Sequence, residues 1–341
     1  MNRLIVFLFA GLCLSGEGAA GSVEELQSFT DFKAGDLKKL SGEDILIRRG
    51  GLMLFPRGLS SQSCFFVPAS AKNTAKAIQM WDPTLHESLG VYLHKTIQSP
   101  PRESDFDSLD LNIAKSPVRW LVDKTLAVKA DRFKFQISRA EAARIAEATQ
   151  GRAPGAEAAG QAWKKILMSR AAGFQQNGLS KAPLYEMSDP PIKTTIEIQS
   201  LLKEEPRIAE RFSRFLAEAR LIGAGRAPRS RIAIQYYWEL FEAEDHAALC
   251  LGASHLKAVG DHYQVIDCGY YVSNAYYTSL VLFEVWPVEG GSLVWRADLL
   301  SSSSVAAAKG IERMAFSMVM IQEIKKAIRF FQRDMRQASK G

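Results

Sequence analysis

The spacing of apolar residues changes along this chain, and that change constrains the fold more than any other feature of the sequence. Beyond residue 231 apolar side chains recur at every second position, as they do in strands. One face of the first such segment holds Ile232, Ile234, Tyr236, Trp238 and Leu240. Alternating segments continue to residue 300, and the last two are joined across Glu289-Gly290-Gly291. The sequence therefore predicts an antiparallel meander of about five strands.

A long helix is predicted after these strands. Four serines at positions 301–304 offer capping groups, and apolar residues then recur at steps of three or four as far as about residue 337. The resulting stripe consists of Ile311, Met314, Met318, Ile321, Ile324, Ile328, Phe331 and Met335. At about 1.5 Å per residue the helix would be roughly 50 Å long, so we expect it to lie across a whole sheet.

Shorter elements are predicted near the N-terminus. Residues 22–40 are typical of a short polar helix, and two apolar runs around Gly50-Gly51 indicate a hairpin. A strand is then expected to end at Pro68, and Ser70 is placed to cap the helix that follows. In this part of the chain a strand leads directly into a helix.

Residues 99–225 are predicted to form a block of helices and loops. Ser138 and Glu141 have the spacing of a capping box, and a helix is expected to end near Asn177-Gly178. Another helix begins at Pro206, in the first-turn position that proline favours. Its apolar stripe consists of Ile208, Phe212, Phe215, Ala219 and Ile222. This stripe must pack against another apolar surface.

The first twenty residues have the organisation of a secretory signal peptide. Met1-Asn2-Arg3 is positively charged, residues 4–14 are apolar, and Gly18-Ala19-Ala20-Gly21 supplies small residues for cleavage. The apolar run of about eleven residues is well short of the roughly 20 that a membrane-spanning helix needs, and no later segment comes closer. We therefore expect an exported protein, periplasmic or extracellular, with no transmembrane segment in the mature chain.

Cys64, Cys250 and Cys268 remain after removal of such a peptide, so at most one disulfide can form. Cys250 and Cys268 lie on neighbouring predicted strands and are expected to pair in an oxidising compartment. Three reduced and buried cysteines are the alternative.

The formal net charge of +6 suits anionic lipid headgroups or cell-surface polymers. The basic residues are spread along the chain, however, and no DNA- or RNA-binding signature accompanies them. We therefore expect no nucleic-acid partner.

The order of elements resembles that of helix-grip proteins. "VPASAKNTAKAIQMW" is similar to the first helix of the START-like lipid-binding superfamily, and "AAAKGIERMAFSMVMIQEIKKAIRFFQRDM" to its gripping helix. The resemblance covers roughly residues 43–95 and 230–337, and it departs from the family in the helical block between them. It implies an α+β fold in which a long C-terminal helix grips an antiparallel sheet. The resulting division is a signal peptide (1–20), a hairpin and first helices (21–98), a helical insertion or lid (99–225) and the strands with the long C-terminal helix (226–341).

The same resemblance implies a lipid or another hydrophobic small molecule held between the sheet and the last helix. Aromatic strand residues would form rigid walls and methionines adaptable ones. The candidate wall residues are Tyr236, Trp238, Tyr277, Phe283, Trp295, Met314 and Met318. A sheet covered on both faces would explain the same aromatic residues as core, without any ligand.

No motif in the sequence specifies a reaction. There is no glycine-rich phosphate loop after a strand and no CxxCH haem site, so no cofactor or metal is expected. An envelope hydrolase or metal-dependent enzyme using His246, His255 or His262 is a second hypothesis. A third is an interaction module, in which the helical block binds a partner protein of the envelope.

Overall fold

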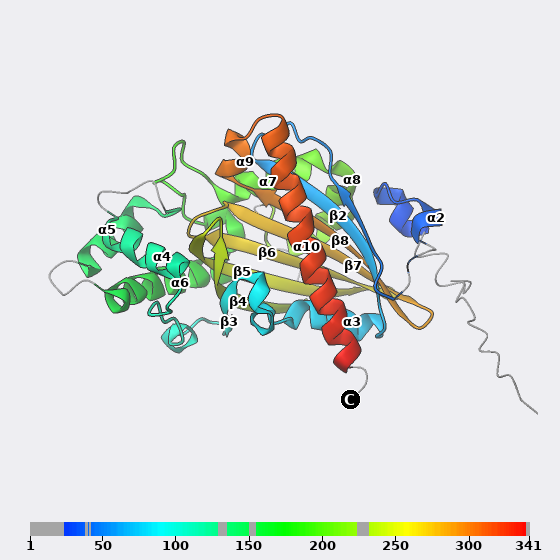
Figure 1. The fold of residues 1–341 in the computed structure, drawn as a ribbon, viewed down its shortest axis with the longest axis horizontal. Coiled ribbons are helices and arrows are strands. Elements are labelled where there is room, and N and C mark those ends of the chain that lie inside the picture. The colour runs from blue at the N-terminus through cyan, green and yellow to red at the C-terminus, as the bar shows by residue number, and fades with distance from the viewer. Residues whose placement is uncertain are drawn as a thin grey trace, which may run out of the picture.

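The structure, a computed structural model, describes residues 24–37, 40, 42–128, 135–149, 155–223 and 232–338. Its centre is an eight-stranded sheet in the order β1-β2-β8-β7-β6-β5-β4-β3, in which every neighbouring pair is antiparallel (Figure 1). The strands are β1 (Ile45–Arg49), β2 (Gly58–Val67), β3 (Val91–Ile97), β4 (Ala233–Ala243), β5 (His246–Val259), β6 (His262–Val272), β7 (Thr278–Val288) and β8 (Gly291–Ser301). The predicted five-strand meander corresponds to β4–β8, and the hairpin to β1 and β2.

Helices pack on both faces of the sheet. They are α2 (Ala34–Leu37), α3 (Ala71–Met80), α4 (Ser116–Leu126), α5 (Arg139–Ala148), α6 (Ala156–Asn177), α7 (Thr194–Glu204), α8 (Pro206–Glu218), α9 (Ser303–Ala307) and α10 (Ile311–Ala338), and residues 24–29 are also helical. Four short 3₁₀ turns are η1 (Pro83–Leu85), η2 (Glu87–Leu89), η3 (Glu103–Phe106) and η4 (Gly178–Lys181). Figure 1 shows α10 crossing the strands on one side of the sheet, with α4, α5 and α6 grouped at one end.

The strands present two buried faces. The side that packs against α3 and α10, here called the α10 face, carries Phe65, Phe283 and Val294, which meet Ile328 and Phe331 of α10. The opposite side, here called the block face, packs against the helices of the 99–225 block and against the N-terminal residues. Its largest buried side chains include Trp163, Trp238, Trp286, Trp295, Phe212 and Phe215. The predicted α+β class, with an antiparallel sheet and a C-terminal helix packed on it, is confirmed.

Several local predictions are also confirmed. The Ser70 side chain accepts a hydrogen bond from the Asn73 amide at the start of α3. Ser138 and Glu141 form a reciprocal capping box at α5. The helices α6 and α8 end and begin at the residues expected from their glycine and proline signals. Local capping chemistry therefore fixes these boundaries.

The C-terminal helical region differs from its prediction in two ways. A break at residues 308–310 separates α9 from α10, and Gly310 there has a φ of +51°, which favours glycine. The 28 residues of α10 span about 42 Å rather than about 50 Å. The expected apolar stripe is also divided, because Ile324 and Ile328 are buried whereas Ile311 is 85% exposed. The first turn of α10, around Ile311, is thus exposed, and the helix packs on the sheet further along, around Ile324 and Ile328.

Other elements depart from the sequence analysis as well. No strand was predicted at β3, which forms the edge of the sheet beside β4. The predicted helix over residues 22–40 is interrupted at residues 30–33 in its described part. None of the described helices is long and apolar enough to cross a membrane. The predicted signal peptide, residues 1–20, lies outside the described residues.

The expected disulfide between Cys250 and Cys268 is wrong. Cys268 packs in the core of the block face, whereas Cys250 packs with Ala248 and Val272 in a separate cluster. An added Cβ on Gly269 would lie 3.5 Å from Cys250 Sγ, so the Cys250 thiol points to the side of the sheet that Gly269 faces. Cys268 is the neighbouring residue on the same strand and therefore points to the other side. All three described cysteines are free and buried, as in the alternative expectation.

Candidate functional site: a cleft between the sheet and the last helix

A cleft lies between the α10 face of the sheet and α10. It consists of two adjoining hollows. The one beside α3 and β3, here called the inner hollow, measures about 380 Å³, and the one beside the β4–β5 turn and α9, here called the outer hollow, measures about 760 Å³. Four residues line both hollows and make them one space: Leu89, Val281, Glu323 and Ile324. No residue of the 99–225 block is among those described along its walls, because that block packs on the opposite face.

The walls of the cleft are mainly apolar. Around the inner hollow they are Ile78, Trp81, Pro83, Leu89, Val91, Val281, Phe283, Ile324 and Ala327. Around the outer hollow, Phe316, Val319 and Met320 of α10 face Leu59 and Leu300 of the sheet. Such walls suit the hydrocarbon part of a ligand.

The floor of the inner hollow carries a tyrosine and a carboxylic acid. The Tyr237 hydroxyl donates a hydrogen bond of 2.7 Å to Asp267 Oδ1. The Tyr237 ring occupies space left by Gly252, where an added Cβ would lie 2.1 Å from the ring carbon Cζ. Burial raises the pKa of Asp267 to about 6, and the nearby Glu239 charge adds to the rise while the Tyr237 hydrogen bond opposes it. Among the described residues, no Lys, Arg or His forms an ion pair with Asp267.

A histidine and a glutamate form a second pair beside this floor. His94 on β3 and Glu239 on β4 are direct cross-strand partners, and 2.8 Å separates His94 Nδ1 from Glu239 Oε1. The His94 ring also stacks on Tyr237, with 5.1 Å between ring centroids. Burial lowers the pKa of His94, but the hydrogen bond and charge of Glu239 outweigh it, so the net shift is upward. Glu239 therefore has a cationic partner at mildly acidic pH.

The arginine of the inner hollow is also paired. Arg296 contacts Asp298, two residues away on β8, through two hydrogen bonds of 2.8 and 2.5 Å. Its guanidinium carbon lies 5.5 Å from the centroid of the Phe283 ring. This bidentate pairing satisfies the charge of Arg296 within the protein itself.

Acidic residues greatly outnumber basic ones along the cleft. The acids that line it are Glu87, Glu239, Glu242, Glu244, Asp245, Asp267, Asp298 and Glu323. The basic residues that line it are His94 and Arg296. The lining of the cleft therefore has an excess of acidic side chains, although four of the eight are ion-paired and the whole chain carries a formal charge of +6.

The structure distributes the seven predicted wall residues over three places. Phe283 lines the inner hollow. Met314 and Met318 lie on α10 but are 46% and 58% exposed. The other four belong to the block face or pack against its core: Tyr236, Trp238, Tyr277 and Trp295.

Contacts on the block face account for these aromatic residues. Trp238 donates its indole N–H to the Asp105 carbonyl at 2.8 Å and stacks near Phe106. Trp295 meets Phe29 edge-on at 5.0 Å between ring centroids. Four floor residues of the cleft were missed by the sequence analysis: His94, Tyr237, Glu239 and Asp267. The signal available for Asp267 was its position as a lone acid inside an otherwise apolar strand segment.

The three histidines of the enzyme hypothesis lie in different environments. The His246 ring packs on Trp120 at 4.2 Å between centroids. His255 is buried, and desolvation lowers its pKa to about 4. His262 bonds to Glu284, with 3.0 Å between Nε2 and Oε2. Over the residues that the structure describes, no group of three or more His, Cys, Asp or Glu side chains could hold a metal ion.

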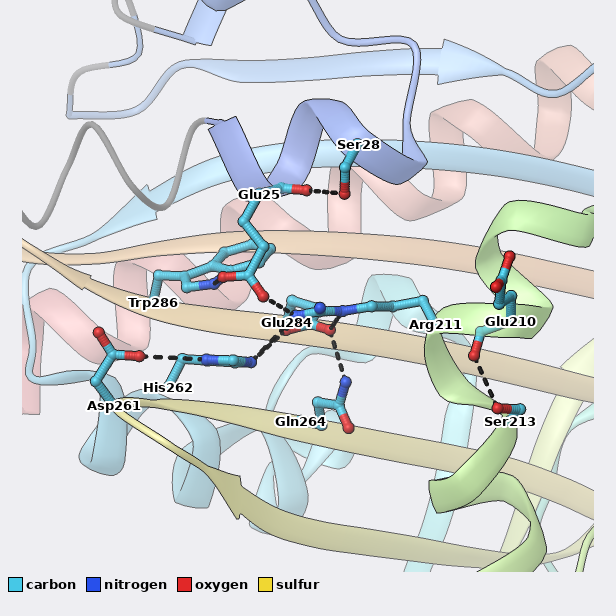
Figure 2. Close-up of polar contacts among 10 residues, drawn as sticks. All are labelled: Glu25, Ser28, Glu210, Arg211, Ser213, Asp261, His262, Gln264, Glu284 and Trp286. Atoms are coloured by element: carbon cyan, nitrogen blue, oxygen red, sulfur yellow. Dashed lines mark hydrogen bonds and ion pairs between the residues drawn. The ribbon is translucent and has the colours of Figure 1, made fainter.

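A second polar cluster, centred on Glu284, lies on the block face (Figure 2). The fully buried Glu284 carboxylate accepts hydrogen bonds from Arg211 Nε and Gln264 Nε2, both at 2.7 Å, and pairs with His262. Arg211 also contacts Glu25 at 2.5 Å. These contacts join α8, the N-terminal helical residues, β6 and β7. The charged groups of the cluster bond to one another, so the cluster holds these elements together rather than offering a site to a ligand.

Exposed apolar residues gather at the first turns of α10. This apolar patch consists of Leu52, Leu54, Ile311, Met314, Met318 and Val319. Arg313 donates hydrogen bonds of 2.9–3.3 Å to the carbonyls of Met53, Phe55 and Gly58, which hold the β1–β2 loop against α10. Val319 belongs to the patch and also lines the outer hollow. The patch is therefore continuous with the wall of the outer hollow, and this end of the cleft is here called its mouth.

Comparisons with protein-family models, with curated proteins and with solved structures found no match to this chain. The cleft, with its walls and its charges, is therefore the feature of the molecule that points to a function.

Proposed function

We propose that this protein is an exported, non-catalytic binding protein that holds a lipid or another apolar small molecule in the cleft between the sheet and α10. The observation that carries the proposal is the cleft itself, with hydrophobic walls on the sheet side and on the helix side. Its hollows of about 380 and 760 Å³ have the size of small-molecule sites, which commonly measure about 300–1,000 Å³.

The order of elements supports the same proposal. From β2 the chain continues through α3, β3, the inserted helices α4–α8, the meander and α10, and β2 lies beside β8 in the sheet. This order is compatible with the helix-grip architecture that the sequence resembles. In the START-like superfamily, that resemblance implies a ligand between the sheet and the last helix, which is where the cleft lies.

A substitution that fills the cleft tests the proposal. Val281 lines both hollows, so Val281→Trp should block them. Ile234 lies on β4 of the same sheet, is 45% exposed and does not line the cleft, so Ile234→Trp is a matched control. The measurement is mass spectrometry of solvent extracts from natively purified protein, together with binding of an apolar fluorescent probe. Loss of ligand and probe in Val281→Trp alone would support the proposal, and equal binding by both variants and wild type would refute it.

The apolar patch favours a second function, docking on an anionic lipid surface. Between residues 309 and 336 the chain carries seven basic and three acidic residues, a net charge of +4. Helical segments that lie in a membrane interface combine exposed apolar residues with basic ones, which anionic headgroups attract. Since the patch borders the mouth of the cleft, docking would bring that mouth to the lipid surface.

Vesicle co-sedimentation tests this second function. The protein should bind vesicles of phosphatidylglycerol and phosphatidylcholine more strongly than vesicles of phosphatidylcholine alone, and Met318→Glu should weaken binding. Leu184→Glu changes a 41% exposed residue of the helical block and serves as the control. Dimerisation through the patch without vesicle binding, seen by analytical ultracentrifugation, would assign the patch to a second copy of the chain instead.

A further inference from the structure

We infer that the ligand of this cleft is a cation, namely an amine whose ammonium group pairs with the Asp267 carboxylate while its apolar body lies along α10. This inference rests on the proposed function and adds to it the chemical class of the ligand. It depends on three observations: the pairing of charges in the inner hollow, the balance of charge along the whole cleft, and the shape of the floor.

The charges of the inner hollow are paired except at one place. Glu239 bonds to His94 and Arg296 bonds to Asp298, so these four groups satisfy one another. Asp267 accepts a hydrogen bond from the neutral Tyr237 hydroxyl, and the nearby Ser254 hydroxyl and His94 charge also favour its ionised form. Among the described residues, however, no cation lies within ion-pair distance of it. Asp267 is partly exposed, on the wall of the hollow, and a desolvated carboxylate without a counter-ion there tends to take up either a proton or a cation. The raised pKa of Asp267, about 6, reflects this tendency.

The balance of charge along the cleft favours a cation as well. Eight acidic and two basic residues line the two hollows in a chain whose formal charge is +6. Some of these acids have partners outside the cleft, such as Lys115 for Glu87 and Lys326 for Glu323. Even so, acidic side chains concentrated in a cleft with apolar walls attract cations and repel anions. A carboxylate or phosphate head would meet charges of its own sign.

The floor has a shape that suits an ammonium group. The Tyr237 hydroxyl holds one oxygen of Asp267, which fixes the orientation of the carboxylate. The aromatic rings of Tyr237, Trp81 and Phe283 line the same hollow and give it flat, rigid walls. The walls beyond the floor are apolar, so a hydrocarbon body can extend from the ammonium group toward the outer hollow.

The test uses three probes with the same chain: octylamine, octanol and octanoate. Isothermal titration calorimetry at pH 7 should show that octylamine binds about tenfold tighter or more than the other two, the effect expected of one charge-assisted hydrogen bond. Asp267→Asn should remove most of this preference and leave octanol binding nearly unchanged. The control is Asp107→Asn, because Asp107 is exposed and lies outside the cleft.

A pH series on the wild-type protein tests the same point without any substitution. Because Asp267 has a pKa of about 6, octylamine affinity should rise as the pH increases from 5 to 7, and binding near pH 6 should release a proton. Glu239 and His94 face the same carboxylate, and loss of the His94 charge with rising pH acts in the same direction. If octanol or octanoate binds as tightly as octylamine and the affinity does not depend on pH, the inference is wrong while the proposed function stands. If none of the three probes binds the wild type, both are refuted.

Discussion

Replacing Arg211 with methionine should destabilise the protein by about 3 kcal/mol, because the substitution leaves the buried Glu284 carboxylate without its arginine. The Glu284 side chain is 0% exposed and Arg211 meets it through Nε at 2.7 Å. Removing one partner of a buried ion pair costs about 3–5 kcal/mol, and we expect the lower end since His262 and Gln264 remain bonded to the same carboxylate. Methionine keeps the aliphatic part of the side chain, so the loss reports mainly on the charge.

Arg207 provides the matched control, one turn earlier on the same helix. It pairs with Asp31 at 2.5 Å, but the two side chains are 53% and 71% exposed. Exposed pairs of this kind contribute from about 0 to 1 kcal/mol, so Arg207→Met should have little effect. With a urea m-value of about 3 kcal/mol per M, Arg211→Met should shift the unfolding midpoint by roughly 1 M, whereas Arg207→Met should leave it nearly unchanged.

The pH dependence adds a further check on this reasoning. Burial raises the pKa of Glu284, but its bonds to His262 and Arg211 outweigh burial and hold the pKa below its ordinary value. A carboxylate with a lowered pKa stabilises the fold above its unfolded pKa, and this stability is lost as the pH falls through the folded value. The difference between wild type and Arg211→Met should therefore shrink in acid. Equal effects of the two arginine substitutions at neutral pH would refute the structural role assigned to the cluster.

Other substitutions and reagents test the remaining parts of the structure. Ile328 is 1% exposed and Ile311 85% exposed on the same helix, so in urea denaturation Ile328→Ala should cost about 2–5 kcal/mol and Ile311→Ala less than about 0.5 kcal/mol; equal costs would contradict the packing of α10. The three described cysteines should resist a thiol reagent until the protein is denatured, since burial raises the pKa of each thiol, and a thiol that reacts in the native protein would contradict this. Because the pKa of Asp267 rises to about 6, its contribution to stability should be lost as the pH rises from about 4 to 6, so in thermal melts the stability of the wild type relative to Asp267→Asn should fall over this range, and a constant difference would contradict it. Gly252→Ala would place a Cβ 2.1 Å from the Tyr237 ring, so it should displace that ring and weaken probe binding in the cleft, and unchanged affinity would contradict the assigned floor.

The architecture of the sheet was predictable because its elements are encoded locally. Alternation in the last third of the chain specifies β4–β8, and glycine at the β7–β8 turn has the positive φ that such a turn requires. Serine caps at Ser70 and Ser138 set the starts of two helices. The edge strand β3 was missed, since it is short and carries three consecutive polar residues, 94–96, that weaken its alternation.

The cleft-facing residues were not predictable from the same pattern. Both faces of the central strands are buried, so apolar and polar residues do not alternate along them. The sequence therefore does not show which of two neighbours, such as Tyr236 and Tyr237, faces α10. A shift of one residue moves a side chain to the other face, and the sequence analysis chose Tyr236 and Trp238. The structure places Tyr237 and Glu239 on the floor of the cleft instead.

The chemistry of the floor depends on contacts between residues far apart in the chain. His94 and Glu239 are separated by 145 positions, because the helical block lies between β3 and β4. The block packs on the opposite face of the sheet, so β3 and β4 pair as though the insertion were absent and the α10 face stays open to a ligand. Glu239, the other acid of this floor, pairs with His94. The Asp267 carboxylate, which has no ion-pair partner among the described residues, is therefore the position at which the proposed amine would bind.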